Sequence, residues 1–293
     1  MKKIKESRAL SFLIILLVYI ISGALGILVY KSLSMHFALK LLLADVAATV
    51  VCFVFSLVFS NSSVYDPYWS VQPPVIATGF LIASGGSVGI ILLIVISFWA
   101  IRLTANWAYT FKGLTHQDWR YTMLKETTGK LYPVINFVGI HLVPTLVVYA
   151  CVLPAVYAIQ SGAEPNAPFV LFSILSIAAT VIQAIADIEM QSFRKEKRQG
   201  FIRLGLWKYS RHPNYLAEIL MWWGVGLASF SLMPSRPYLL IGAILNTLLF
   251  AFVSIPMAER RQSKKQGFDS YKNETRVLFP IPKKIKKSTA KLV

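Results

Sequence analysis

The sequence is poor in charge and in cysteine, and each shortage excludes a class of protein. Only 15% of its 293 residues are charged, whereas about a quarter are charged in an ordinary soluble domain. The two cysteines, Cys52 and Cys151, lie inside apolar runs, which is typical of small buried side chains and not of a disulfide or a metal pair. We therefore expect neither a soluble globular domain, nor a disulfide-stabilised fold, nor a metal centre.

The nucleotide-binding motifs of soluble proteins are also missing. The chain has no G-x-G-x-x-G after a strand, no P-loop and no H-E-x-x-H. Any nucleotide must therefore bind through helix ends and basic loops. A net charge of +17 would suggest nucleic acid in a soluble protein, but here Lys and Arg lie beside apolar runs. That pattern favours membrane topology signals and contact with anionic lipid headgroups, so we expect no nucleic-acid partner.

Long apolar runs are what the sequence has in abundance, and 56% of its residues are hydrophobic. About 20 apolar residues cross the hydrocarbon core of a bilayer. The clear candidate spans are 9–30, 37–59, 134–158, 167–188, 214–232 and 238–257. The stretch 69–105 is interrupted by Gly85, Gly86 and Ser87, so it is either one long span or a hairpin of two. These runs predict an all-α polytopic integral membrane bundle with seven or eight transmembrane helices.

The charge distribution favours eight helices over seven. The basic segments are the N-terminal tail, 102–130, 194–211 and the residues after Glu259, and the positive-inside rule places such segments in the cytosol. Only a hairpin broken at the two glycines brings all of them to one side. We therefore expect a multi-pass membrane protein with both termini in the cytosol.

Polar residues beside two of the spans are candidates for a ligand site, because ionisable groups at a membrane are costly and are usually paired or functional. Arg102 and Asn106 are four residues apart and share a helix face, although Arg102 alone would suit a charge that snorkels to the membrane edge. Gln183, Asp187 and Arg194 fall close together on another helix. A direct Asp187–Arg194 ion pair across two turns would be strained, so a ligand between them is the other interpretation.

The strongest candidate is the string from Gly205 to Trp223. Pro213 suits the first turn of a helix, whose free N–H groups and positive dipole end attract anions. Asn214 and Glu218 are four residues apart and face one way where this helix enters the bilayer, where a carboxamide or a ribose hydroxyl could pair with them. His212 alone would suit a helix cap. The basic residues beside this helix start are Arg203, Lys208, Arg211 and His212.

In three further segments, contact with the membrane explains some of the polar residues without a ligand site. An interfacial aromatic belt accounts for Tyr68 and Trp69 but less well for Asp66. A basic end to the last span accounts for Arg260 and Arg261 but not for Glu259. The lysine-rich segment 283–293 is typical of a solvated tail that rests on anionic lipid.

The string from Gly205 to Gly224 resembles the bacterial DUF1295 family, which is related to the C-terminal domain of steroid 5α-reductases and to sterol C14 reductases. The resemblance covers about residues 60–282 and divides the chain into two N-terminal transmembrane helices (1–60), a family-like membrane domain (61–282) and a basic cytosolic tail (283–293). Separate upstream matches include Asp66, Tyr68, Trp69, Arg102, Asn106, Trp107, Asp118, Tyr121, Gly139, His141, Asp187 and Glu189.

The resemblance implies an NADPH site at the cytosolic side of the bundle. Asp187 and Arg194 match the reductases' spacing of a cofactor-binding Asp and Arg, and Asn214 and Glu218 match residues at the nicotinamide end. The residues so expected to bind the cofactor are Arg102, Asn106, Asp187, Arg194, Arg203, Trp207, Tyr209, Arg211, His212, Asn214, Tyr215, Glu218, Arg260 and Arg261. The expected catalytic residues are Tyr68, Tyr215 and Glu218. The acidic and tyrosine pair with which those reductases polarise a substrate carbonyl has no match in the sequence.

The expected activity is hydride transfer from NADPH to the C=C bond of an enone in a lipophilic, steroid- or isoprenoid-like substrate that enters from the membrane lipids. A tyrosine would stabilise the developing enolate, and Tyr68, Tyr109 and Tyr215 are the candidates. The alternative is an isoprenylcysteine- or phospholipid-type methyltransferase, in which the string 211–215 and Glu259 would hold S-adenosylmethionine. The extra basic residues favour a 2′-phosphorylated dinucleotide. A transporter would need polar groups along a midplane path, whereas here they gather at one face.

Overall fold

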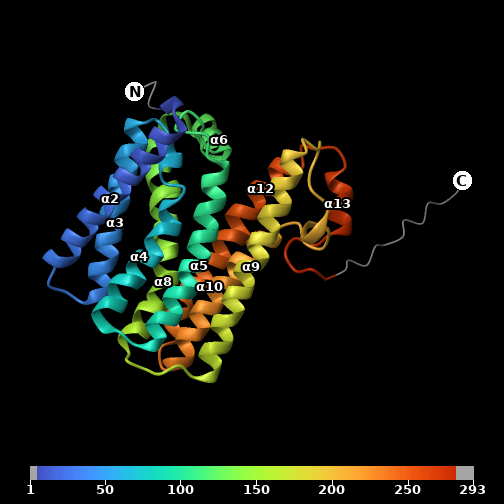
Figure 1. Ribbon diagram of the computed structural model, residues 1–293. Helices are drawn as coiled ribbons and strands as arrows, with labels where there is room; N and C mark the ends of the chain where they lie inside the picture. The colour runs from blue at the N-terminus through green and yellow to red at the C-terminus, as the bar shows by residue number, and fades with distance from the viewer. Residues whose placement is uncertain (1–4, 282–293) are drawn as a thin grey trace, which may run out of the picture.

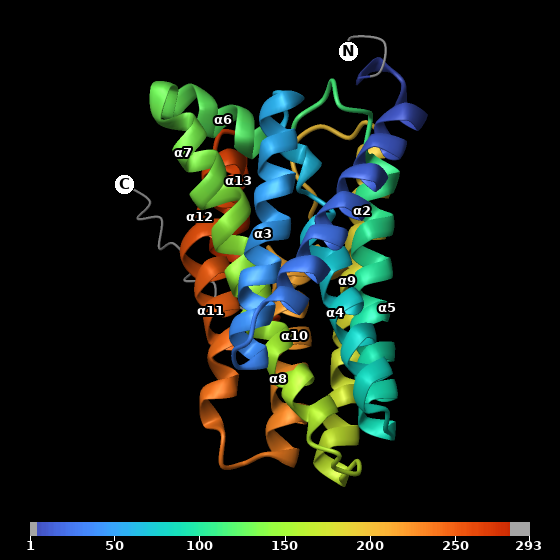
Figure 2. The ribbon, with the colours of Figure 1, turned by 90° about the vertical axis from the view of Figure 1, so that its left-hand side faces the viewer.

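The computed structural model describes residues 5–281, which form a bundle of long helices without a single strand in that range. The N-terminal pair is α2 (Arg8–Ser32) and α3 (Phe37–Val58). It is followed by α4 (Tyr68–Ser84), α5 (Ser87–Thr110), α8 (Val143–Gln160), α9 (Ala167–Lys195), α10 (Pro213–Leu232) and α11 (Ile241–Leu249). Figure 2 shows the long helices side by side. The expected all-α class is confirmed, whereas the basic tail 283–293 lies outside the described residues.

The stretch 69–105 is a hairpin of two helices, as the charge distribution predicts. Gly85 and Gly86 separate α4 from α5 and adopt φ angles of 69° and 88°, a conformation that glycine reaches without steric cost. Seven helical stretches of the described chain are long and apolar enough to cross a bilayer. The 17-residue α4 packs antiparallel against α5 as the eighth passage through the bundle. The chain is therefore a multi-pass membrane protein.

Four short helices lie at one end of the bundle (Figure 1). They are α6 (Trp119–Thr128), α7 (Tyr132–Ile135), α12 (Ile255–Gln262) and α13 (Phe268–Glu274). Figure 1 shows α6, α12 and α13 at the end where α2 begins, so the basic segments of the described chain gather there. This arrangement agrees with the positive-inside pattern.

Two π-helical turns interrupt the helices on the C-terminal side of the bundle. One spans Asn136–Leu142 between α7 and α8, and the other spans Phe250–Ser254 between α11 and α12. Such turns are frequent at functional sites because they rotate the side chains that follow. The second turn carries Phe250, whose ring lies 4.9 Å from the ring of Tyr215 in α10.

The most extensive helix packing in the described part of the bundle joins α9 to α10. A Cβ added at Gly224 would overlap the hydroxyl of Ser176, so only glycine permits this approach. Ser176 also donates a hydrogen bond of 3.1 Å to the backbone carbonyl of Met221. The 29-residue α9 is longer than a membrane span requires, and its last turns project beyond the bundle toward α13 (Figure 1). This extension carries several of the predicted site residues.

Candidate functional site

Glu218 of α10 is the centre of a buried polar cluster. Both carboxylate oxygens accept hydrogen bonds from the indole of Trp99, at 2.9 and 3.0 Å. Trp222 donates to Oε1 at 3.0 Å, and Gln183 donates to Oε2 at 2.8 Å. A carboxylate in an apolar helix needs such partners, because an unpaired buried charge is very costly. Glu218 is therefore held in one position from three helices.

Arg102 connects this cluster to Asp187. Its guanidinium lies 2.7 Å from the Asp187 carboxylate and 3.4 Å from that of Glu218, so α5, α9 and α10 are joined by charge. The direct Asp187–Arg194 pair, which would be strained across two helical turns, is not among the ion pairs of the described residues. Arg194 instead lines a cavity that Asp187 also faces. This geometry leaves room for a ligand between Asp187 and Arg194.

The helix start at Pro213 is occupied by an internal ion pair. Arg211 contacts both oxygens of Glu259 in α12, at 2.9 and 3.0 Å, and His212 Nε2 lies 2.8 Å from Oε1. This pairing accounts for Glu259, which a basic end to the last span did not explain. It also means that the positive charge of Arg211 is already balanced by a protein carboxylate.

A cavity of about 520 Å³ opens beside this ion pair, at the end of the bundle that carries the basic segments. Its walls come from α5, α6, α9, α10, α12, α13 and the segment 196–212. Among the predicted cofactor-binding residues, those that line it are Asn106, Asp187, Arg194, Trp207, Arg211, His212, Asn214, Tyr215 and Arg261. The sequence therefore identified residues from four separate segments that the fold brings to one cavity.

The cavity presents unpaired cations and aromatic faces. Arg194, Lys197 and Arg261 form no ion pair within residues 5–281, and the Arg261 guanidinium lies 4.3 Å from the ring centre of Trp119. The Tyr215 ring stacks on His212 with centroids 5.2 Å apart. These groups suit a ligand with both anionic and planar parts.

Asn214 carries an unsatisfied acceptor at the inner end of this cavity. Its side-chain Oδ1 is buried and has no hydrogen-bond partner in the described part of the chain. Burying such an oxygen without a donor costs roughly 1–3 kcal/mol. Asn214 lies one helical turn before Glu218, so this unsatisfied oxygen is located where the cavity meets the buried cluster.

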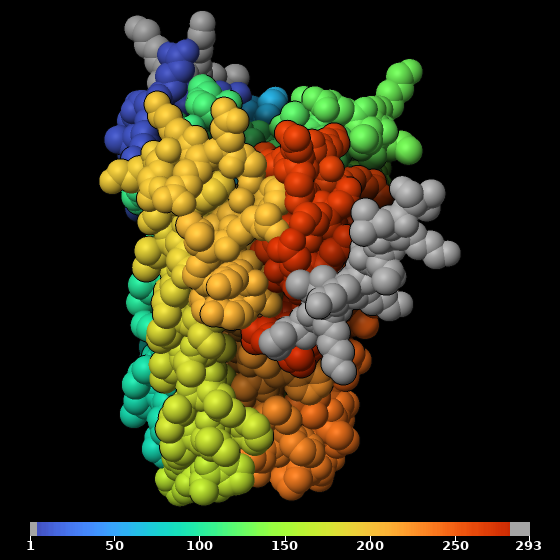
Figure 3. All heavy atoms as spheres, turned by 90° about the vertical axis from the view of Figure 1, so that its right-hand side faces the viewer, coloured from blue at the N-terminus to red at the C-terminus, as the bar shows by residue number. Residues whose placement is uncertain are grey.

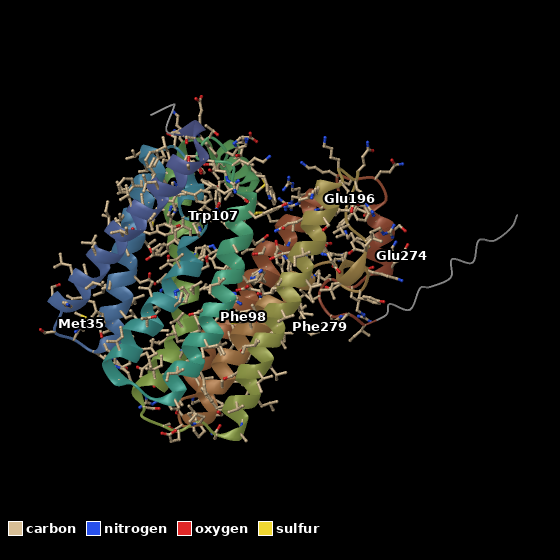
Figure 4. All side chains as sticks on the ribbon, viewed as in Figure 1. Met35, Phe98, Trp107, Glu196, Glu274 and Phe279 are labelled. Atoms are coloured by element: carbon tan, nitrogen blue, oxygen red, sulfur yellow. The ribbon has the colours of Figure 1, made fainter. Side chains whose placement is uncertain are left out.

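Five of the predicted cofactor-binding residues lie outside the cavity lining. Arg102 and Glu218 lie in the buried cluster described above, and Arg203 forms an exposed 2.8 Å pair with Glu274. Tyr209 and Arg260 are exposed. Figure 4 places Glu274 with Glu196 on the part of the molecule beside the bundle, away from Trp107 of α5.

The outer wall of the cavity is the segment 196–212 packed against α13. Glu189 of α9 accepts hydrogen bonds from the Leu206 amide at 3.0 and 3.2 Å, and a Cβ at Gly205 would overlap that carboxylate. Tyr271 donates to the Trp207 carbonyl, and burial raises the pKa of this phenol. Figure 3 shows the two segments in contact, the first in gold and α13 in red. Their contact fixes Trp207 in the wall.

Tyr68 lies in a different place, at a second pocket between α2, α3 and α4. This groove of about 380 Å³ is mostly apolar, and two of its polar side chains meet at the buried carboxylate of Asp45. Tyr68 donates to Oδ1 at 2.8 Å, and Gln72 donates to Oδ2 at 2.7 Å. The sequence reasoning named Tyr68 but missed Asp45 and Gln72. The available signal was an acidic residue inside the apolar run 37–59, which needs a partner.

The loop before α4 is tied to α6 by Asp66. Tyr121 donates to Asp66 Oδ1 at 2.5 Å, and burial raises the pKa of Asp66 to about 6. Asp118 caps α6 by accepting from the Arg120 amide at 2.9 Å, and the Arg120 side chain lowers the pKa of Asp118. This connection accounts for Asp66, which an aromatic belt explained poorly, and it fixes the start of α4 where Tyr68 lies.

Comparison with known proteins agrees with this architecture. The model of the family described as "Protein of unknown function (DUF1295)" matches residues 52–275. The chain belongs to the DUF1295 family. An uncharacterized protein of Schizosaccharomyces pombe is 25% identical over 268 residues, which is 80% of this chain and 75% of that protein. No solved structure matches the chain.

A more distant relative has a named activity. The 3-oxo-5-alpha-steroid 4-dehydrogenase 1 of Macaca fascicularis is 30% identical over 129 residues, which is 43% of this chain and 45% of the macaque protein. The chain therefore spans less than half the length of that relative in the match. The relationship to steroid 5α-reductases that the sequence motifs suggested is confirmed at this distance.

Proposed function

We propose that this protein is a membrane-embedded reductase that uses NADPH to reduce a C=C bond conjugated to a carbonyl in a lipophilic substrate. The observation that carries the proposal is the cavity with unpaired cations at its rim and the unsatisfied Oδ1 of Asn214 at its inner end. The name of the macaque relative, which describes a dehydrogenase of 3-oxo-steroids, supports a steroid-like substrate class.

The lining of the cavity fits the separate parts of NADPH. Arg194, Lys197 and Arg261 would hold its phosphates, because charge-assisted hydrogen bonds from unpaired cations favour such anions. Tyr215 offers an aromatic face. The Asn214 Oδ1 atom would accept a hydrogen bond from the nicotinamide carboxamide, which removes the cost of an unsatisfied buried oxygen.

When bound, this cofactor supplies the hydride. The chain's own contribution at this end is position and charge: Arg102 balances Asp187 and Glu218, and the buried cluster around Glu218 fixes α5, α9 and α10 relative to one another. Rigid placement of reactants is a large part of catalysis because a small displacement of the reacting atoms slows the reaction strongly.

The groove at Tyr68 is the proposed acceptor site. The Tyr68 hydroxyl donates to Asp45 in this structure, and on substrate binding it would turn this single O–H to the substrate carbonyl and so stabilise the negative charge that develops on this oxygen when a hydride arrives at the β-carbon. Gln72 would keep its own hydrogen bond to Asp45. The apolar walls of the groove would exclude water, and a steroid- or isoprenoid-like molecule could occupy them. Of the other two tyrosines considered, Tyr109 is exposed and Tyr215 belongs to the cofactor cavity.

The orientation in the membrane follows from the same proposal. The cavity lies at the end of the bundle that carries the basic segments, and the positive-inside rule places this end in the cytosol, where NADPH is available. Both ends of the chain would then be cytosolic, in the inner membrane of a bacterium.

Cofactor binding tests the proposal most simply. Calorimetric titrations of the detergent-purified chain would compare NADPH, NADH and S-adenosylmethionine, with Asn214→Ala as the test variant and Tyr209→Ala, at an exposed residue outside the cavity, as the control. We expect saturable NADPH binding that weakens in the Asn214 variant and not in the control. Binding of S-adenosylmethionine without NADPH binding would overturn the reductase in favour of a methyltransferase.

A further inference from the structure

The end of the groove at the last turn of α2, here called the open end, carries donors that no protein group uses. Tyr30 and Lys31 both line the groove there. Lys31 is exposed and forms no ion pair or hydrogen bond within residues 5–281, and the Tyr30 hydroxyl has no hydrogen-bond partner in that range. Both groups are therefore free to donate to a bound molecule, unlike Tyr68, whose single O–H is donated to Asp45.

A second lysine adds positive charge at the open end. Lys40 of α3 has its Nζ 4.4 Å from the ring centre of Tyr30. Neither Lys40 nor Lys31 has a carboxylate partner in the described chain, and the turn 33–36 between α2 and α3 contains no acidic residue. Figure 4 labels Met35 of this turn, which lies away from the end of the bundle where the basic segments gather. The positive-inside pattern therefore does not account for these two lysines.

The groove extends along α2 and α4 from the buried carboxylate at its inner end to the open end. The rings of Tyr19 and Tyr68 lie 5.7 Å apart at the inner end. The rings of Tyr30 and Phe80 lie 6.2 Å apart at the open end. Tyr19 and Tyr30 are eleven residues apart in one helix, so a rise of about 1.5 Å per residue separates the two ends by about 16 Å. A ligand that contacts both ends must therefore be elongated.

The space between the two ends is mostly apolar and open. Gly23 of α2 and Gly79 of α4 line it, and a Cβ added at either glycine would contact no atom within 4 Å. Val75 and Ile76 contribute apolar side chains. The volume of about 380 Å³ lies near the lower end of the range for pockets that enclose a small molecule, so it suits one apolar body and not the two chains of a phospholipid.

We propose that the open end is an anion site and that the ligand of the groove is a lipophilic carboxylic acid. Lys31 would pair with the carboxylate, the Tyr30 hydroxyl would donate a hydrogen bond to it, and the apolar body would extend toward Asp45. This position keeps the carboxylate in contact with water, which avoids the cost of burying a charge. The inference rests on the proposed function of the groove and narrows its substrate to an enone acid, with the enone at the inner end.

The expected selectivity is modest because Lys31 is exposed. An ion pair near water contributes less to binding than a buried pair, since the solvent screens it. We expect a carboxylate to bind about fivefold more tightly than the matched neutral ester, the upper part of the range for an exposed pair. The preference should weaken at high salt.

Binding of three matched probes tests the proposal without NADPH. Each is a 2-cyclohexenone with a decyl chain that ends in a carboxylate, a methyl ester or a trimethylammonium group. The full chain in phosphatidylcholine nanodiscs would be titrated by calorimetry at about pH 8, where a free carboxyl is ionised. Lys31→Gln removes the charge, Lys31→Arg keeps it, and Gly23→Leu fills the groove. Lys125→Gln is the control, at an exposed lysine of α6 outside both pockets.

We expect the wild type, Lys31→Arg and Lys125→Gln to bind the carboxylate about fivefold more tightly than the ester, and the cationic probe most weakly. Lys31→Gln should bind the carboxylate and the ester alike, with an ester affinity close to that of the wild type. Gly23→Leu should bind none of the probes. Thermal unfolding would verify that all the variants are folded.

Several outcomes would overturn the proposal. They are equal affinities for carboxylate and ester in the wild type, a preference that persists in Lys31→Gln or is lost equally in Lys125→Gln, binding that persists in Gly23→Leu, and no saturable binding at all. Displacement of the ester probe by phosphatidylglycerol in the nanodisc would assign the groove to a phospholipid instead. A carboxylate preference without NADPH oxidation would reject the reductase and retain the anion site.

Discussion

Two pockets of the molecule treat charge in opposite ways. One is the cavity at α9 and α10, and the other is the groove between α2, α3 and α4. The cavity leaves the cations Arg194, Lys197 and Arg261 without carboxylate partners at its rim. The groove instead buries one carboxylate, Asp45, and satisfies it with two donors from α4. Unpaired charge near water suits a hydrophilic anion, and a shielded polar centre in apolar walls suits a lipid head.

Side chains of α4 and α5 lie between the two pockets, and the proposed hydride transfer would need them to move apart. The rings of Trp69 and Trp99 lie 6.0 Å apart, and the hydroxyls of Ser70 and Thr104 lie 2.8 Å apart. Trp99 also donates to Glu218, so these side chains are attached to the buried cluster below the cavity. Their displacement would affect both pockets, whereas changes in either lining should affect one.

The largest expected effect comes from the cluster that supports both regions. Glu218→Ala removes the carboxylate that balances Arg102 and accepts from Trp99, and loss of one member of a buried charge pair costs about 3–5 kcal/mol. We expect a strong fall in thermal stability and in yield from detergent. Glu218→Gln is the control, because its carbonyl still accepts hydrogen bonds. Unchanged unfolding of Glu218→Ala would contradict the role given to the cluster.

A change at Tyr68 should separate the groove from the cavity. Tyr68→Phe keeps the ring and removes the hydroxyl, so we expect turnover of an enone lipid to fall about 100- to 1000-fold, as for the loss of one donor to a developing oxyanion. NADPH affinity should not change, and the exposed Tyr109→Phe is the matched control. Parallel losses of turnover and NADPH affinity would show that the regions are not independent.

Removal of a cation from the cavity should weaken NADPH binding without affecting the groove. Arg194→Ala or Arg261→Ala removes one charge-assisted contact, so we expect NADPH affinity to fall about tenfold. Binding of a lipid probe in the groove should be unaffected. Arg203→Ala is the control, since that side chain is exposed and paired with Glu274. An equal loss of affinity in the control would indicate a general effect of net charge.

The remaining prediction concerns the pH dependence of stability and the loop that fixes the start of α4. The pKa of Asp66 is raised from 3.8 to about 6, so the folded protein binds this proton more tightly than the unfolded chain. The contribution to stability is therefore largest below pH 3.8 and is lost as the pH rises to about 6. Asp66→Asn should remove about 3 kcal/mol of this pH dependence. Melting temperatures at several pH values would measure it, and an unaltered profile would contradict the assignment.

Local sequence patterns predicted the arrangement of the transmembrane helices and part of the lining of one pocket. The hairpin could be predicted because Gly85 and Gly86 interrupt an apolar run and the basic segments require an even number of spans. Asn214 in the cavity and Glu218 in the buried cluster could be singled out because they lie four apart on one helix that follows a basic loop.

The partners of these residues could not be predicted in the same way. Arg102 pairs with Asp187, 85 positions away, and Arg211 pairs with Glu259, 48 positions away. The Asp45–Tyr68 contact depends on how α3 packs against α4, and no spacing within one helix reveals it. Sequence periodicity shows which face a residue occupies, but not which helix covers that face.

The most direct test is the transfer of deuterium from NADPH to a lipid. The purified wild type would be incubated with NADPH deuterated at the transferable position and a lipophilic enone, and the product would be analysed by mass spectrometry beside Tyr68→Phe and Asn214→Ala. We predict a saturated ketone with one deuterium on its β-carbon, formed by the wild type and strongly reduced in both variants. Unchanged enone across a panel of lipids, with the cofactor bound, would contradict the proposed reductase.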